Sequence, residues 1–147
     1  MKAVIQRVKQ ANVKIGAKEI TRIRRGALVL LGVERGDTKQ DVLTLARKIS
    51  ELRFMADEHG KINLSLKDVN GEVLVVSQFT LLADTKKGRR PSFLLAAEPK
   101  VAKHLYEEFI NEMQTLGLKT AKGEFGADMD ISLVNNGPVT LILETKN

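Results

Sequence analysis

Two apolar runs near the C-terminus are joined by the segment Val134-Asn135-Asn136-Gly137-Pro138-Val139-Thr140. The pattern predicts a hairpin turn, but an unusual one, because an ordinary two-residue hairpin places Asn-Gly directly before a strand. Here Pro138 follows Gly137. Proline has no N–H for a ladder, its φ is fixed, and it restricts the residue before it. The segment is therefore expected to form a rigid corner that presents backbone carbonyls, with the Gly137–Pro138 bond either cis or, as is commoner, trans.

Apolar runs elsewhere in the chain predict a sheet with buried central strands. Residues 3–15 include alternating apolar and polar side chains and are expected to form one strand or a bent pair of strands. Residues 27–33 and 73–76 are apolar on both faces, which is typical of strands covered from both sides. The second run leads directly into the polar group Ser77-Gln78-Phe79-Thr80.

Two further segments have the spacing of amphipathic helices. The first is expected to be capped by Asp37, with Gln40 three residues on as in a capping box. Its apolar stripe consists of Val42, Leu45, Ala46, Ile49 and Leu52. The second runs from about Pro99 to Leu116 and stops at Gly117. The elements together predict an α+β fold, a compact single domain over residues 1–147 with a β-sheet or barrel-like core and two main helices.

The composition excludes several classes of enzyme. The chain has no cysteine, which removes disulfides, thiolate zinc sites and a cysteine nucleophile. Its two histidines, His59 and His104, lie in a polar turn and on a charged helix face, so neither a serine–histidine triad nor a histidine metal site is expected. We expect no cofactor and no metal.

Charge and hydropathy indicate where the protein acts. The 24 Lys and Arg against 18 Asp and Glu give a net charge of +6, which suits a polyanionic partner but also an ordinary lysine-rich surface. The N-terminus becomes charged too early for a signal peptide. The apolar runs are too short to span a bilayer. A soluble, cytoplasmic protein with no membrane partner is expected.

Two segments could carry chemistry. Ser77-Gln78-Phe79-Thr80 offers hydroxyl, amide and backbone donors without a charge, as an oxyanion site would, although a strand that turns polar as it leaves the core looks the same. Thr80 as a nucleophile lacks an obvious base. In the basic loop, Lys86, Lys87, Arg89 and Arg90 surround one glycine. They could hold phosphates or be merely solvated.

Together these segments resemble the D-aminoacyl-tRNA deacylases (the D-tyrosyl-tRNA(Tyr) deacylase family), which remove D-amino acids from tRNA. The resemblance covers essentially the whole chain. Its signature blocks are Ser77-Gln78-Phe79-Thr80-Leu81, Asp84 to Phe93, Phe125-Gly126-Ala127-Asp128-Met129 and Asn136-Gly137-Pro138-Val139-Thr140. Asn136 stands where the family often has Asp.

The resemblance implies a homodimer in which each pocket is built by two chains. The Gly137-Pro138 pair would be cis, enter the partner subunit's active site and exclude L-amino acids. Ser77, Gln78, Phe79 and Thr80 would form the catalytic pocket, with Arg7, Phe125 and Met129 as its wall. Lys86, Lys87, Arg89 and Arg90 would bind tRNA.

The resemblance leaves the catalytic step open. Either a ribose 2′-hydroxyl of the tRNA helps to activate water, or Thr80 is the nucleophile. Glycyl-tRNA is a further substrate that a chirality filter would admit. The alternative function is a non-catalytic RNA-binding homodimer with the same fold.

Overall fold

The structure is a computed structural model that describes residues 1–146. Its elements, in chain order, are β1 (Lys2–Ile15), β2 (Lys18–Ile23), β3 (Gly26–Gly32), α1 (Lys39–Glu51), β4 (Met55–Ala56), β5 (Ile62–Leu64), β6 (Glu72–Ser77), the 3-10 helix η1 (Phe79–Leu82), α2 (Pro99–Thr115), β7 (Lys119–Lys122) and β8 (Asp130–Glu144).

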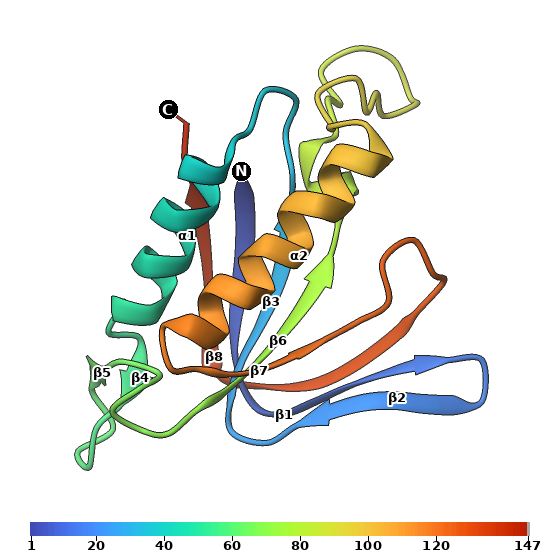
Figure 1. The fold of residues 1–147 in the computed structure, drawn as a ribbon. Helices are drawn as coiled ribbons and strands as arrows, with labels where there is room; N and C mark the ends of the chain where they lie inside the picture. Colours follow the sequence, from blue (N-terminus) through green and yellow to red (C-terminus); the bar gives the residue numbers. More distant parts are fainter. Residues whose placement is uncertain (147) are drawn as a thin grey trace.

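Most of the strands form one mixed sheet. Its order is β2-β1-β3-β6-β7, and β8 pairs with the other edge of β1. The β3–β6 and β6–β7 pairs are parallel, and the pairs made by β1 are antiparallel. Parallel neighbours need a crossover connection. Here α1 and α2 lie within the two crossovers, and both helices cover the same face of the sheet (Figure 1).

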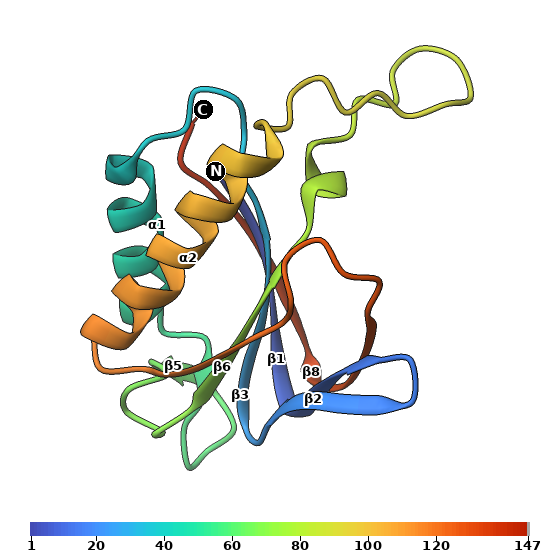
Figure 2. The ribbon, with the colours of Figure 1, turned by 45° about the vertical axis from the view of Figure 1, so that its right-hand side comes forward.

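The sheet separates two apolar cores, because side chains alternate between its faces. Ala27, Val29 and Leu31 of β3 pack under the helices together with Val73 and Val75 of β6. The side chains that alternate with these on β3 and β6 face a second core on the other side of the sheet. This core is closed by the curled β1–β2 pair and the first half of β8 (Figure 2). Its members are Val8, Ala11, Val13, Ile23, Leu28, Leu74 and Val76. This arrangement confirms the predicted α+β class with a barrel-like sheet and two helices.

The first helix begins one residue later than predicted. Thr38, not Asp37, is its N-cap, and the capping box is completed by the side chain of Asp41 rather than Gln40. Of the predicted apolar stripe, Val42, Leu45, Ala46 and Ile49 are buried, whereas Leu52 is the half-buried C-cap just beyond the helix. Asp37 is occupied elsewhere, in contact with the N-terminal ammonium of Met1.

The segment predicted to be a hairpin turn is instead a bulge inside one continuous strand. Both halves of β8 pair antiparallel with β1: Thr140 lies opposite Gln6 and Asn135 opposite Val8. Two steps along β1 therefore correspond to five steps along β8, and the intervening residues of β8 loop out of the ladder. The chain does not reverse, so the prediction of a hairpin was wrong.

The remaining segments are strands or helices as predicted. Residues 3–15 form one strand, and the second helix ends at Thr115 before Gly117, whose φ of +86° suits a helix terminus. The strand β6 ends at Ser77, and Phe79–Leu82 form the 3-10 helix. No helix in residues 1–146 is long and apolar enough to cross a membrane.

Candidate active site

The candidate site lies at the carboxyl ends of the parallel strands β3 and β6. Leu31 and Ser77 are paired across the two strands, and the amide of Gln78 donates to the Leu31 carbonyl at 2.8 Å. Beyond this point the chain turns into η1, so the strand pair ends and leaves room for a ligand. Crevices at the carboxyl ends of parallel strands are common ligand sites.

A cavity of about 490 Å³ opens at this edge. Four segments enclose it: the residue after β3, the end of β6, the start of α2 with the residues before it, and the segment that leads into β8 with the first residues of that strand. Its lining residues are Val33, Val76, Ser77, Gln78, Phe79, Ala96, Ala97, Pro99, Ala102, Phe125, Gly126, Ala127, Asp128, Met129 and Ile131. The structure thus brings Ser77, Gln78 and Phe79 together with Phe125 and Met129.

Neutral groups dominate the chemistry of this cavity. Among its lining residues Asp128 is the one with an ionisable side chain, and Ser77 and Gln78 supply a hydroxyl and an amide. Such donors can polarise a carbonyl where negative charge develops. Phe79 extends the cavity toward solvent, and its ring packs edge-on against Phe93 at 5.0 Å between centroids.

Phe125 is held in the wall by the core beneath it. Its ring packs against Tyr106 at 5.7 Å between centroids. The Tyr106 hydroxyl donates to the Val75 carbonyl at 2.9 Å, which fixes the aromatic pair to β6. Burial raises the pKa of this hydroxyl above its ordinary value. Tyr106 is therefore a neutral structural group rather than an acid or base for the cavity.

Thr80 lies outside the set of lining residues. It is exposed on η1, and its hydroxyl oxygen accepts a hydrogen bond from the Gln78 side-chain amide. In this structure Thr80 therefore orients Gln78. The structure gives it no base partner among residues 1–146.

The Gly137–Pro138 bond is cis. Both residues are exposed and neither lines the cavity of the same chain. The bulge is closed by Asn135, whose side-chain oxygen accepts from the Val139 amide at 2.9 Å. Gly137 has a φ of +140°, and a Cβ there would lie 2.8 Å from Val139 Cγ2 and 3.0 Å from Arg7 Nη2. Only glycine fits this corner without displacement.

Arg7 supports the corner, and it is not among the residues that line the cavity of its own chain. Its Nε donates to the Asn136 carbonyl at 2.8 Å and its Nη1 to the Phe54 carbonyl at 3.0 Å. The residue is buried, with 7% of its surface exposed. The guanidinium therefore links the bulge of β8 to the segment between α1 and β4.

The basic loop projects beyond the first turn of α2 (Figures 1 and 2). It is closed by a two-way backbone bridge, in which Asp84 and Ser92 exchange hydrogen bonds of 2.8 and 2.9 Å. The four predicted tRNA-binding cations, Lys86, Lys87, Arg89 and Arg90, are all exposed. They lie on the segment that connects η1 with the cavity wall at Ala96.

Several lining residues had no signal in the sequence. Val33 and the pair Ala96 and Ala97 are small or apolar, and their place in the wall depends on a contact between distant segments: the Ala97 amide donates to the Val33 carbonyl at 3.0 Å. Asp128 lies in the irregular segment before β8, which begins at Asp130. Within residues 1–146 no group of three or more potential metal ligands is found.

Comparison with known proteins identifies the family. The model of the D-Tyr-tRNA(Tyr) deacylase family matches residues 4–144. A D-aminoacyl-tRNA deacylase of Desulfatibacillum aliphaticivorans is 59% identical over 146 residues, covering 99% of this chain and 100% of that protein. One of Thermosipho africanus is 57% identical, covering 99% of this chain and 98% of that protein.

Solved structures agree with these matches. A structure described as c-Myc DNA Unwinding Element Binding Protein has 40% identity and a TM-score of 0.93, with 100% of both chains covered. A probable eukaryotic D-amino acid tRNA deacylase has 17% identity and a TM-score of 0.83 over 97% of both chains, which shows a shared fold. The extent and level of the sequence matches place this chain in the D-Tyr-tRNA(Tyr) deacylase family of hydrolases.

Proposed function

We propose that this protein hydrolyses the ester bond between a D-amino acid and tRNA, releasing the free amino acid and the tRNA, and that it does so in the cytoplasm. The observation that carries the proposal is the set of neutral hydrogen-bond donors at the end of β6, which line an open cavity. It is supported by the 59% identity of this chain to a D-aminoacyl-tRNA deacylase. An ester carbonyl seated against Ser77 and Gln78 gains stabilisation as its oxygen becomes negative.

The attacking group is water. An ester needs less activation than an amide, and no histidine or cysteine lines the cavity. The ribose 2′-hydroxyl next to the ester is the nearest substrate group that can accept or relay a proton. Thr80 as a nucleophile is the alternative, but its hydroxyl is engaged by Gln78 outside the lining of the cavity.

Discrimination between D- and L-amino acids comes from the Gly137–Pro138 corner of a second copy of the chain. The corner is exposed, is anchored by Arg7 and lies outside its own cavity. A rigid exposed corner of this kind can complete the pocket of a partner in a homodimer. Its backbone would face the stereocentre, so side chains of many kinds, and achiral glycine, would be admitted.

The tRNA is held by the basic loop and by the exposed aromatic pair. The four exposed cations of residues 86–90 contact phosphates. Phe79, 54% exposed at the cavity mouth, offers a ring face on which an unpaired terminal base can stack.

The second candidate is a nucleic-acid-binding homodimer without catalysis. It is favoured by the net charge of +6 and by the name of one similar structure, which describes a binding protein for a DNA element. Packing alone, however, does not require an open cavity lined by polar donors.

The deciding experiment compares D-tyrosyl-tRNA with L-tyrosyl-tRNA at equal concentrations. We expect release of tyrosine from the D form and retention of the L form. Equal release would contradict the chirality filter. No release, with tRNA binding intact, would favour the non-catalytic alternative.

A further inference from the structure

One side chain in the wall of the candidate active site rests on a residue that does not itself line the cavity. Met129 lines the cavity, and the buried Gly123 lies behind it. A Cβ built on Gly123 would lie 2.9 Å from Met129 Sδ and 3.7 Å from Met129 Cε. The first distance is shorter than the optimal separation of two non-bonded heavy atoms. The methionine side chain therefore occupies space that a side chain at position 123 would claim.

The backbone of Gly123 is held in place by its neighbours. Its amide donates to the Val75 carbonyl at 3.0 Å. The Tyr106 hydroxyl lies 2.9 Å from the same carbonyl oxygen and 3.5 Å from the carbonyl oxygen of Gly123. Val75 and Tyr106 both belong to the buried core. The backbone at position 123 therefore cannot retreat from an added side chain without breaking buried hydrogen bonds.

Val76 blocks a second direction of escape. The same Cβ would lie 3.5 Å from Val76 Cγ2, and Val76 is 1% exposed. Met129, by contrast, is half-buried and has an unbranched, flexible side chain, so it is the neighbour that yields at least cost. Ordinary contact would need its sulfur to move by roughly 1 Å. Because Met129 forms part of the cavity wall, this shift carries it toward the space that a ligand would fill.

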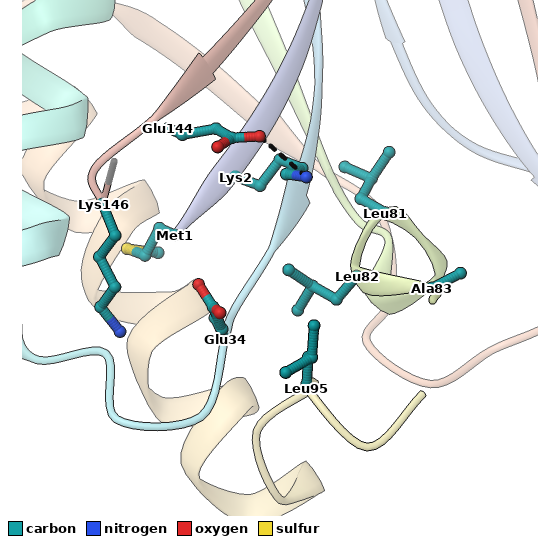
Figure 3. A pocket seen from close by; sticks show the side chains of 9 residues that line it. All are labelled: Met1, Lys2, Glu34, Leu81, Leu82, Ala83, Leu95, Glu144 and Lys146. Atoms are coloured by element: carbon teal, nitrogen blue, oxygen red, sulfur yellow. Dashed lines mark ion pairs between the residues drawn. The ribbon is translucent and has the colours of Figure 1, made fainter. Parts of the chain in front are cut away.

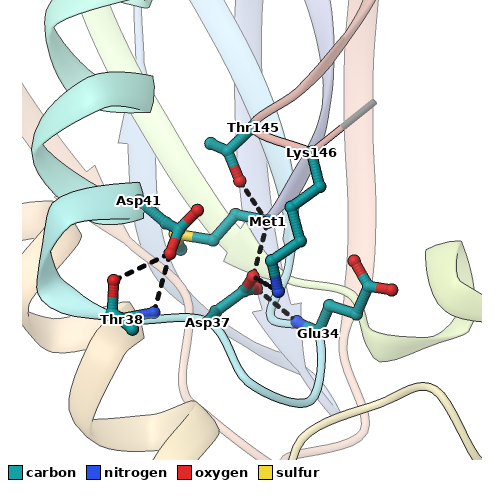
Figure 4. Close-up of polar contacts among 7 residues, drawn as sticks. All are labelled: Met1, Glu34, Asp37, Thr38, Asp41, Thr145 and Lys146. Carbon is teal, nitrogen blue, oxygen red and sulfur yellow. Dashed lines mark hydrogen bonds and ion pairs between the residues drawn. The ribbon is translucent and has the colours of Figure 1, made fainter.

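The wall at Val33 and Ala97 offers no such adjustment. The Ala97 amide donates to the Val33 carbonyl at 3.0 Å, and the amide of the next residue, Glu34, donates to Asp37 Oδ2 at 2.6 Å (Figure 4). A small cavity of about 220 Å³ adjoins this segment at Glu34 and Leu95 (Figure 3). Among the described residues the two cavities share no lining residue, so the small one adds no depth to the candidate site.

We infer that Gly123 determines the depth of the active-site cavity, although it does not line that cavity. In a cavity of about 490 Å³, the absence of a side chain at position 123 lets Met129 lie back against the backbone. Gly123 is thus a positioning residue that acts through Met129, and any larger residue there makes the cavity shallower. The inference rests on the proposed function only for the identity of the substrate.

A planar ring is the ligand group that suits this part of the cavity. Val76, Phe125 and Met129 give it apolar and aromatic surface, and methionine sulfur makes favourable contacts with rings. Two parts of a D-tyrosyl-tRNA carry a ring: the tyrosyl side chain and the terminal adenine. D-alanyl-tRNA carries only the second, so a comparison of the two substrates distinguishes the two sources.

Gly123→Ala tests the inference, and Gly71→Ala is its matched control. Both glycines are buried, both amides donate to a backbone carbonyl, and neither φ lies in the left-handed region. At Gly71 the added Cβ would also lie 2.9 Å from the end of a flexible side chain, Leu66 Cδ2, but neither residue lines the cavity. Both changes are also made in a Met129→Ala background, where the shortened side chain leaves room at position 123.

Three quantities are measured for each variant: the Tm, the kcat/KM for D-tyrosyl-tRNA and D-alanyl-tRNA, and the NMR signals of the methionine methyl groups. The chain has four methionines, and the signal that is missing from Met129→Ala identifies that of Met129. In Gly123→Ala we expect this signal to move, whereas Gly71→Ala should leave it in place. The methyl signal needs no substrate, so it is independent of the proposed function.

The two substrates report on the depth of the cavity. In Gly123→Ala we expect kcat/KM for D-tyrosyl-tRNA to fall about tenfold, and in Gly71→Ala to stay unchanged. In the Met129→Ala background, Gly123→Ala should lower kcat/KM by no more than about twofold, because the two positions act on each other. An equal loss with D-alanyl-tRNA would place the adenine beside Met129. A loss confined to D-tyrosyl-tRNA would place the tyrosyl ring there.

Three results would overturn the inference. An unmoved signal in Gly123→Ala would show that Met129 does not rest on position 123. A moved signal with unchanged kcat/KM for both substrates would show that Met129 yields away from the cavity. A loss of activity or of Tm that is equally large in the Met129→Ala background would show that the added methyl group acts on another neighbour. If the unaltered chain hydrolyses neither substrate, the proposed function fails, and the methyl signal still decides whether Gly123 positions Met129.

Discussion

Arg7 Nε lies 2.8 Å from the carbonyl oxygen of Asn136, the residue immediately before the cis Gly137–Pro138 bond. A buried guanidinium on β1 therefore holds the exposed corner of β8 across a break in their ladder. The second bond of the fork, from Nη1 to the Phe54 carbonyl, prevents the side chain from moving with the corner.

Arg7→Lys keeps the charge but cannot make both bonds in this fixed geometry. We expect a loss of stability of about 2 kcal/mol, because a buried carbonyl loses a charge-assisted hydrogen bond. The ratio of D- to L-tyrosyl-tRNA hydrolysis should also fall, since the corner is no longer held. Urea unfolding and parallel deacylation assays measure the two effects. An unchanged ratio in a destabilised protein would limit Arg7 to a role in folding.

Mixed dimers test whether the corner acts in the partner's pocket. Gly137→Val disrupts the corner, and Ala102→Phe fills the cavity from α2. Each variant alone should be inactive while remaining folded. Refolded together, they should regain about a quarter of the wild-type activity, because half the dimers are mixed and each has one intact pair of pocket and corner. If the corner served its own chain, the mixture would stay inactive.

Thr80→Val removes the hydroxyl and keeps the shape of the side chain. Since Thr80 lies outside the cavity lining and accepts from Gln78, we expect kcat to fall by roughly tenfold or less through poorer orientation of Gln78. Single-turnover hydrolysis of D-tyrosyl-tRNA measures this directly. Loss of all activity with tRNA binding preserved would identify Thr80 as the nucleophile.

The basic loop should determine how tRNA binding responds to salt. Replacing Lys86, Lys87, Arg89 and Arg90 with glutamine should weaken tRNA binding. The slope of log K against the logarithm of the salt concentration should become less steep by about one for each phosphate that is no longer neutralised. The control is glutamine at Lys61 and Lys67, two exposed residues in the region of β4 and β5 at the other end of the molecule, and the slopes are compared per cation removed (Figure 1). Equal slopes in the two variants would exclude the loop as the tRNA-binding segment.

Tyr106 should make stability sensitive to alkaline pH. Burial raises the pKa of its hydroxyl above the ordinary value of 10.0, and the charge of Glu107 adds to that shift. The unfolded chain releases this proton first, so stability should decline as the pH rises above about 10. Tyr106→Phe should cost about 1 kcal/mol at neutral pH through the lost bond to Val75. It should also flatten the alkaline decline, which urea midpoints between pH 8 and 11 would reveal.

Local sequence patterns predicted the helices and strands whose formation is determined mainly by the residues within them. The run at residues 27–33 is apolar on both faces because β3 lies between two cores, and the second helix stops where Gly117 permits a positive φ. The place of Ser77 and Gln78 at the end of a strand followed from the buried run that leads straight into them.

Features that depend on distant contacts could not be predicted in the same way. The cap of α1 moved from Asp37 to Thr38 because the N-terminal ammonium, 36 residues away in sequence, binds Asp37. The bulge at Gly137 has the local sequence of a hairpin, because nothing nearby in the chain reveals that both of its flanks pair with β1. The part of the wall at Ala96 and Ala97 is likewise placed by a bond to Val33.

The bulge of β8 also restricts how the length of this chain can change. Its flanks, at Asn135 and Thr140, are both registered against β1. A single residue inserted or deleted between them must either distort the corner or slip one flank by one position. Such a slip would turn Leu141 and Leu143, which pack against the core, to the opposite face. An insertion or deletion of a single residue between Asn135 and Thr140 is therefore expected to be more damaging than a substitution at the same place.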